Sequence, residues 1–216
     1  MMTNHKLLVA SVLLYSCAVN VSAQPDEQTL EMLLQAIDTL SADVVQLIVE
    51  SDGGVLEESE IHMYLKKPNG FYWETLSPFP ELVVINDDTL WNYVPDLEQV
   101  VVEDWDWESD RSELAAQLLS GRTENLSTQY AIVLVAGTDS EYQEFELTPL
   151  ASDSIYEQIS INFLAAELDM IYLNNKNGQK TVWQFENAVR NQPLEDSLFE
   201  FVPPDGIEVI ENNYTR

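Results

Sequence analysis

The densest group of side chains that could do chemistry is the segment from Glu103 to Asp110, which reads Glu-Asp-Trp-Asp-Trp-Glu-Ser-Asp. Clustered carboxylates can ligate Ca²⁺, or act as the acid and base of a glycosidase. The segment lacks the EF-hand pattern, because it has no central Gly and no Glu at the twelfth position. Alternating Trp and acidic residues are more typical of a loop or strand edge with inward-facing tryptophans. We therefore expect neither a metal site nor catalysis here.

Histidine and cysteine chemistry is nearly excluded by composition. The chain has two His and one Cys, and both His5 and Cys17 lie in an N-terminal segment that we expect to be removed. The remaining His62 alternates with Ile61 and Met63, which predicts the polar, solvated face of a strand. One His cannot build a zinc site of several imidazoles. Glycine-rich phosphate loops and Gly-x-Ser-x-Gly motifs are absent, so we expect no catalytic residue and no cofactor.

The elements that must position these residues are mostly strands. Residues 61–102 alternate apolar and polar side chains between turn signals, as antiparallel strands do. Their large aromatics include Tyr64, Phe71, Tyr72, Trp73 and Trp91. Helices are expected at 25–40, where leucines recur at helical spacing, and at 111–120. Strands are expected at 44–50, 55–66, 71–76, 82–85, 89–93, 97–102, 130–136, 142–149, 158–164, 169–173 and 181–185, with a short edge strand at 199–202.

A meander of about eleven strands must curl, and amphipathic helices need an apolar surface to cover. We therefore predict a mainly β fold with some α, an unclosed antiparallel β-barrel with a helical lid over an apolar cavity. A surplus of large apolar side chains would fill or line its interior, and the residues alone favour a packed core over a cavity. The candidate lining residues are Leu30, Leu34, Met63, Phe71, Trp73, Trp91, Tyr93, Leu118 and Leu119.

The first 23 residues have the pattern of a cleavable signal peptide. A weakly basic start precedes the apolar run Leu7–Val19, and Val21-Ser22-Ala23 fits a small-x-small cleavage site. The run is too short to span a bilayer, which takes about 20 residues. We expect residues 24–216 to form a single domain in the periplasm. Lipidation at Cys17, within Leu-Tyr-Ser-Cys, is an alternative.

The formal net charge is −29, from 9 basic and 38 acidic residues. Such a chain cannot supply the basic surface that nucleic acid requires, and anionic bilayers repel it. Self-repulsion at this charge destabilises a compact chain, and salt of about 1 M screens it. We therefore infer a saline periplasm. Disorder is excluded, because 45% of the residues are hydrophobic and 10% are aromatic.

Residues 67–99 and the closing segment resemble the signature regions of the LolA family of periplasmic lipoprotein carriers. A basic-Pro-Asn-x-Phe-x-Trp turn precedes a Leu-Trp hairpin, and Phe-x-Phe-x-Pro-Pro-x-Gly closes the pattern. The matching residues are Lys67, Pro68, Asn69, Phe71, Trp73, Val83, Val84, Asp87, Thr89, Leu90, Trp91, Tyr93, Pro95, Gln99, Phe199, Phe201, Pro203, Pro204 and Gly206.

The resemblance implies a monomeric carrier that is not an enzyme and whose interior holds the acyl chains of triacylated lipoproteins. It would accept them from a LolCDE-type inner-membrane complex and deliver them to a LolB-type receptor at the outer membrane. The family usually has Arg where this chain has Lys67, and that Arg ties the lid to the barrel. Lysine lacks the planar fork of arginine, so we expect a weaker lock. Phe71 matches a position implicated in accepting cargo.

Three alternatives stay open from the sequence. A LolB-like outer-membrane acceptor would follow if Cys17 is lipidated. A lipid-sensing regulator of the RseB type is similar in fold. A secreted hydrolase using the carboxylates of residues 103–110 belongs to a different class. For Lys66 and Lys67, a solvated strand end stays open as an equal alternative to a role in locking the lid.

Overall fold

The computed structural model describes residues 26–105, 126–137 and 141–212. The helical elements are α1 (Asp26–Gln35), η1 (Pro95–Leu97), α3 (Leu126–Gln129) and η3 (Asp196–Phe199). The strands are β1 (Thr39–Val49), β2 (Val55–Lys66), β3 (Gly70–Ser77), β4 (Glu81–Asn86), β5 (Thr89–Val94), β6 (Gln99–Asp104), β7 (Tyr130–Ala136), β8 (Tyr142–Pro149), β9 (Tyr156–Leu164), β10 (Glu167–Asn175), β11 (Lys180–Arg190) and β12 (Glu208–Asn212).

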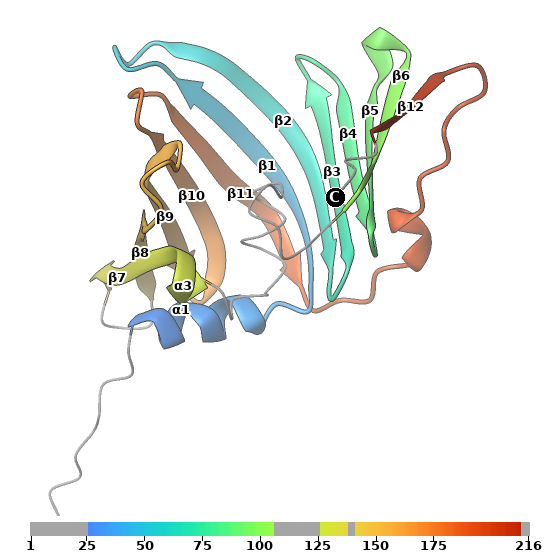
Figure 1. Cartoon of the computed structure of the whole chain (residues 1–216). Helices are drawn as coiled ribbons and strands as arrows, with labels where there is room; N and C mark the ends of the chain where they lie inside the picture. Colours follow the sequence, from blue (N-terminus) through green and yellow to red (C-terminus); the bar gives the residue numbers. More distant parts are fainter. Residues whose placement is uncertain (1–25, 106–125, 138–140, 213–216) are drawn as a thin grey trace, which may run out of the picture.

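The strands form one sheet in the order β12-β6-β5-β4-β3-β2-β1-β11-β10-β9-β8-β7. The end strands β12 and β7 do not pair with each other, so the sheet is an unclosed barrel. Figure 1 shows it curling into a half-barrel, with α1 lying across one end and α3 beside β7. This architecture confirms the predicted fold class. The predicted helix at 111–120 lies outside the described residues.

Two predicted elements near the ends of the domain were wrong. The edge strand expected at 199–202 is absent: η3 ends at Phe199, and the added strand is β12, which pairs with β6 in parallel. The helix expected to reach residue 40 ends at Gln35. Beyond it, Leu40, Ala42 and Val44 are buried alternately, because β1 pairs with both β2 and β11 and strand geometry replaces the helical spacing.

The main core covers the inner, concave face of the sheet. Side chains from β2, β3, β4, β8, β9 and β10 alternate inward and meet the buried Leu30 and Leu34 of α1. Phe145 and Phe163, on neighbouring strands, are both fully buried and contact edge to face at 6.1 Å. Helix α1 therefore closes the core at one end of the half-barrel.

Candidate functional site

The inner face brings together five of the predicted lining residues. Leu30, Leu34, Met63 and Phe71 are at most 1% exposed and belong to one apolar cluster. Trp73 is partly buried against that cluster, with its ring stacked on Phe71 at 6.1 Å. Two of these residues come from α1 and the others from β2 and β3, so the helix and the sheet share one apolar surface.

Trp183 of β11 also lies on the inner face, although it was not among the lining residues predicted from the sequence. It is 7% exposed and contacts Trp73 edge to face at 5.5 Å. Its indole nitrogen donates a hydrogen bond of 2.8 Å to Gln46 Oε1, so a polar atom within this face has a partner. Alternation with the buried Phe185 was the signal that could have identified it.

Two of the predicted lining residues face the other way. Leu90 points into the inner cluster, so its neighbour Trp91 and the residue two further on, Tyr93, lie on the outer face. Their rings lie 5.7 and 5.8 Å from that of Phe201. The assignment of Trp91 and Tyr93 to the cavity was therefore wrong. The remaining two, Leu118 and Leu119, lie outside the described residues.

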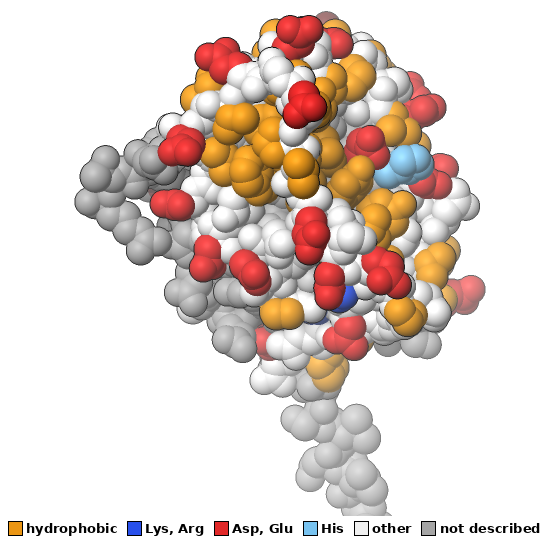
Figure 2. All heavy atoms as spheres, turned by 90° about the vertical axis from the view of Figure 1, so that its right-hand side faces the viewer, with side chains coloured by type: hydrophobic (Ala, Val, Ile, Leu, Met, Phe, Trp, Pro, Cys, Tyr) orange, Lys and Arg blue, Asp and Glu red, His pale blue; other side chains and the backbone are white. Residues whose placement is uncertain are grey.

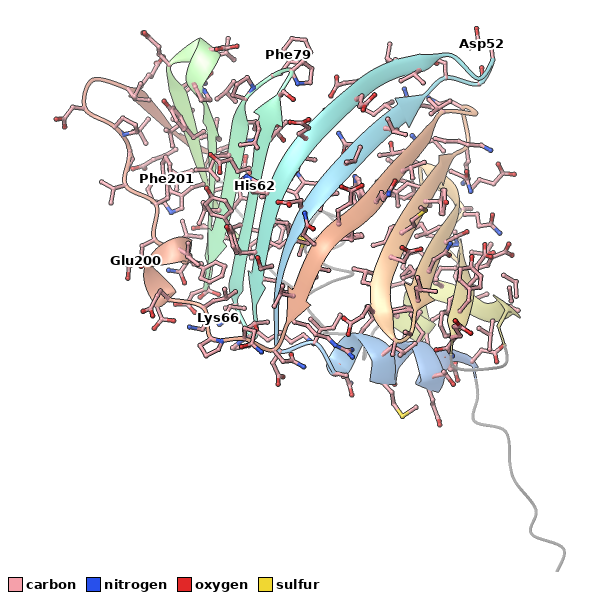
Figure 3. The ribbon with its side chains drawn as sticks, turned by 180° about the vertical axis from the view of Figure 1, so that it is seen from behind. Asp52, His62, Lys66, Phe79, Glu200 and Phe201 are labelled. Atoms are coloured by element: carbon pink, nitrogen blue, oxygen red, sulfur yellow. The ribbon has the colours of Figure 1, made fainter. Side chains whose placement is uncertain are left out.

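Phe201 belongs to the C-terminal arm, defined here as residues 191–212, which follows β11. Seen from behind, the arm passes outside β3, β4 and β5, with Phe201 and Glu200 at its middle (Figure 3). Phe199 is 3% exposed and packs over Gly70 of β3. The arm thus covers an apolar strip on the outer face, separate from the inner cluster.

Lys67 fastens α1 to the turn between β2 and β3. Its ammonium group donates hydrogen bonds to the carbonyl oxygens of Leu34, at 2.7 Å, and Gln35, at 3.4 Å. The last carbonyls of a helix have no partners within it and carry its negative dipole end, so a cation is favourable there. Burial lowers the pKa of Lys67, and the charge of Asp38 opposes this shift.

Lys66 holds the C-terminal arm. Its ammonium group donates a hydrogen bond of 2.7 Å to the carbonyl oxygen of Leu194 and pairs with the carboxylate of Asp196. Figure 3 shows Lys66 at the end of the sheet where the arm begins. Both lysines therefore bind other segments, and the interpretation of a solvated strand end was wrong.

The other candidates for chemistry lie away from the inner face. His62 Nδ1 is 2.7 Å from a carboxylate oxygen of Asp43, and both side chains are 45% exposed, as expected for the polar face of a strand. Asn187 donates a hydrogen bond of 2.7 Å to Asp43, and this bond is the main cause of the lowered Asp43 pKa. These contacts form a solvated surface cluster rather than an enclosed site.

Part of the acidic segment is described. Glu103 accepts a hydrogen bond of 2.9 Å from Asn212 of β12, Asp104 is exposed, and Trp105 is 8% exposed within the inner cluster. Residues 106–110 lie outside the described part. Among the described residues, no three His, Cys, Asp or Glu side chains are grouped to hold a metal ion. No helix in the same ranges is long and apolar enough to cross a membrane.

Comparison with known proteins places this chain in a family. The profile described as "Outer membrane lipoprotein carrier protein LolA" matches residues 35–202. The chain belongs to the LolA family. Curated LolA-family relatives include the outer-membrane lipoprotein carrier proteins of Chromohalobacter salexigens and Pseudomonas putida. The alignment with the first has 34% identity and covers 85% of this chain and 85% of the relative. The alignment with the second has 32% identity and covers 95% of this chain and 97% of the relative.

Among solved structures, a LolA superfamily protein from Nitrosomonas europaea overlaps 82% of this chain and 99% of its own. The TM-score is 0.45 and the identity is 13%. Membership of the LolA family rests on the profile match and on the curated relatives.

Proposed function

We propose that this chain is a periplasmic carrier that shields the acyl chains of lipoproteins against the inner face of its sheet. The observation that carries this proposal is the fastening of α1 by Lys67 over a continuous apolar face, in a chain of the LolA family. An interior covered by a helix that side-chain hydrogen bonds hold in place can open without unfolding the sheet.

The chemistry of the inner face suits acyl chains. Each CH₂ group removed from water contributes about 0.8 kcal/mol, so the tails of a triacylated lipoprotein require a shielded apolar surface. Leu30, Leu34, Met63, Phe71 and Trp73 offer such a surface once α1 moves. On the basis of the sequence, Leu118 and Leu119 would also line this surface.

The proposed route has two partners. A LolCDE-type inner-membrane complex would load the carrier, and a LolB-type outer-membrane receptor would unload it. Carriage of this kind requires no chemical step by the carrier itself, so we propose that it is not an enzyme. Direction would come from the different affinities of successive partners for the cargo.

Phe71 is assigned a role in loading. Its side chain is 1% exposed beneath the closed helix, so an exporter or its cargo would reach it only after α1 has moved. Lys67 and Phe71 would therefore act in order, with the release of Lys67 from Leu34 preceding contact at Phe71.

Export would use residues 1–23 as a signal peptide, leaving residues 24–216 as a monomeric domain. Mass spectrometry of protein purified from the periplasm tests this directly. A mature chain starting at Gln24 supports the soluble carrier. A lipid-modified chain starting at Cys17 would instead support a LolB-like acceptor.

The decisive experiment is lipoprotein release. The chain, expressed in full and purified from the periplasm, is added to spheroplasts that have a matched exporter but lack their own carrier. We expect a soluble one-to-one complex with a triacylated lipoprotein. Absence of that complex at a salt concentration where the protein is folded would overturn the carrier function. The lipid-sensing regulator of the RseB type would then be the remaining proposal for this fold.

A further inference from the structure

A second side chain also binds the end of α1. Asn191 Nδ2 donates a hydrogen bond of 2.9 Å to the carbonyl oxygen of Ala36, and its Oδ1 accepts one of 2.8 Å from the amide of Asp38. One amide side chain thus satisfies both an acceptor and a donor directly after the helix. Neutral hydrogen bonds of this kind are modest individually but specific in geometry.

Backbone contacts anchor Asn191 at the end of the sheet. It is the first residue beyond β11, and its amide donates a hydrogen bond of 2.8 Å to the carbonyl oxygen of Thr39. Its φ of 58° lies in the left-handed region, which Asn tolerates better than most residues. Thr39 Oγ1 also donates to the carbonyl of Gln192, at 2.6 Å. The side chain therefore projects from a fixed point at the end of the sheet.

Asn191 and Lys67 approach the helix from different strands. Lys67 follows β2 and binds the carbonyls of Leu34 and Gln35, whereas Asn191 follows β11 and binds the next carbonyl, that of Ala36. Since β2 and β11 flank β1 on opposite sides, the two contacts hold consecutive carbonyls from both sides.

We propose that Asn191 is a positioning residue that fastens α1 independently of Lys67, so that both contacts must break before the helix leaves the inner face. The two fastenings differ in chemistry. The contact of Lys67 is made by a cation and weakens as salt screens it, whereas the amide contact carries no net charge. Asn191 would therefore keep α1 closed in saline conditions under which Lys67 alone holds it less firmly.

Hydrogen exchange of the full chain tests the fastening without any cargo. The variants are Asn191→Gly, Lys67→Met and the double variant; glycine accepts the left-handed backbone, so the loss concerns the side chain. Asn187→Gly is the matched control, because Asn187 lies nearby within β11, also has a left-handed φ, of 50°, and donates one side-chain hydrogen bond, to Asp43.

We expect Asn191→Gly to raise exchange at the Leu33 and Leu34 amides about tenfold, given two lost hydrogen bonds. Exchange at Ile171, in the middle of β10, should change less than about twofold, as in Asn187→Gly. The double variant should multiply the two single effects. Unchanged exchange in α1, an equal rise at Ile171, or a double variant that matches Lys67→Met would each overturn the proposal.

The consequence for cargo rests on the proposed carrier function and is measured separately. The rate of lipoprotein hand-over to an acceptor should rise in Asn191→Gly and rise further in the double variant. If exchange in α1 responds as expected while no variant binds or transfers lipoprotein, the fastening stands and the carrier function fails.

Discussion

Lys66 and Lys67 are consecutive in the chain, yet their ammonium groups hold different segments of the protein. Lys67 binds the carbonyl of Leu34 at the end of α1, and Lys66 binds that of Leu194 in the C-terminal arm, both at 2.7 Å. The end of β2 is therefore the point where the closing helix and the arm are both attached to the sheet.

The first prediction concerns the charge of Lys67. Its pKa in the folded chain lies below the ordinary 10.5, mainly through burial, so between these values the unfolded chain binds more protons. The stability contribution of Lys67 must then rise as the pH increases through that window. The free energy of unfolding of the natural chain minus that of Lys67→Met should accordingly increase as the pH rises toward the ordinary value of 10.5.

Subtracting the free energy of Lys67→Met removes the contribution of the tyrosines, which is present in both chains. The titration of the tyrosines changes the free energy of unfolding in the opposite direction. The pKa values of Tyr72 and Tyr142 are raised, mainly by burial. The unfolded chain therefore loses these protons before the folded chain does, and stability falls as the pH rises above the ordinary value of 10.0. Denaturant unfolding at each pH gives both free energies. A difference that stays flat or falls with pH would contradict the burial of a charged Lys67.

The second prediction concerns the seat of the arm on β3. A Cβ at Gly70 would lie 3.0 Å from the ring of Phe199, so Gly70→Ala should displace the arm and cost about 1–3 kcal/mol of stability, as overpacking does. Limited proteolysis should then cut the arm sooner. Gly54→Ala is the control, because a Cβ there meets mainly a flexible Asp52 oxygen at 3.1 Å.

A smaller side chain at Phe199 offers a further check. In the Gly70→Ala background, Phe199→Leu should recover only part of the lost stability, because the added Cβ meets both the ring of Phe199, at 3.0 Å, and the backbone oxygen of Lys66, at 3.1 Å. Two losses that simply add would show that Gly70 acts through something other than Phe199.

The third prediction separates the two faces of the sheet. Trp73 faces the inner cluster, whereas Trp91 packs on Phe201 outside. We expect Trp73→Leu to weaken the lipoprotein complex by about tenfold or more, because apolar area against the acyl chains is lost. Trp91→Leu should leave cargo affinity within about twofold while lowering stability by about 1–3 kcal/mol.

Both variants are compared by the yield of the one-to-one complex across a series of carrier concentrations. Since the two substitutions are chemically identical, any difference reports position alone. Equal losses of affinity in Trp73→Leu and Trp91→Leu would refute the division into a cargo face and an arm face.

The fourth prediction concerns salt. The chain has 38 acidic and 9 basic residues, and Figure 2 shows carboxylates spread over the side that carries the arm, around an apolar area. Screening this repulsion with NaCl of about 1 M should raise the melting temperature by roughly 4–8 °C, equivalent to about 2 kcal/mol. Sucrose of equal osmolarity controls for excluded-solute effects.

Charge removal should produce the same gain without salt. Glu58 and Glu60 lie on one face of β2 and are exposed, so replacing both with Gln should stabilise the chain at low salt and leave it unchanged at about 1 M. A melting temperature that does not rise with salt would remove the inference of a saline periplasm.

Local sequence patterns determined most of the strands and the inner side of many of them. Met63, Phe71 and Trp73 alternate with polar or smaller residues, and that period of two survives in the structure because one sheet face is buried. The Asn177-Gly178 pair is likewise a local hairpin signal, and Gly178 has the positive φ, 87°, that a tight hairpin requires. The resemblance to the LolA family was visible in residues 67–99 and the closing segment, and the profile match over residues 35–202 confirms it.

Only the tertiary structure decided which face each aromatic residue occupies when both faces are apolar. Trp91 and Tyr93 looked like interior residues, but the C-terminal arm gives the outer face its own apolar cover, through Phe201. The lone amide of Asn191 gave no signal either, because its contacts with Ala36 and Asp38 span about 150 residues of sequence. Local patterns record the period of a strand, whereas contacts between distant segments depend on how the whole sheet curls and where its ends meet.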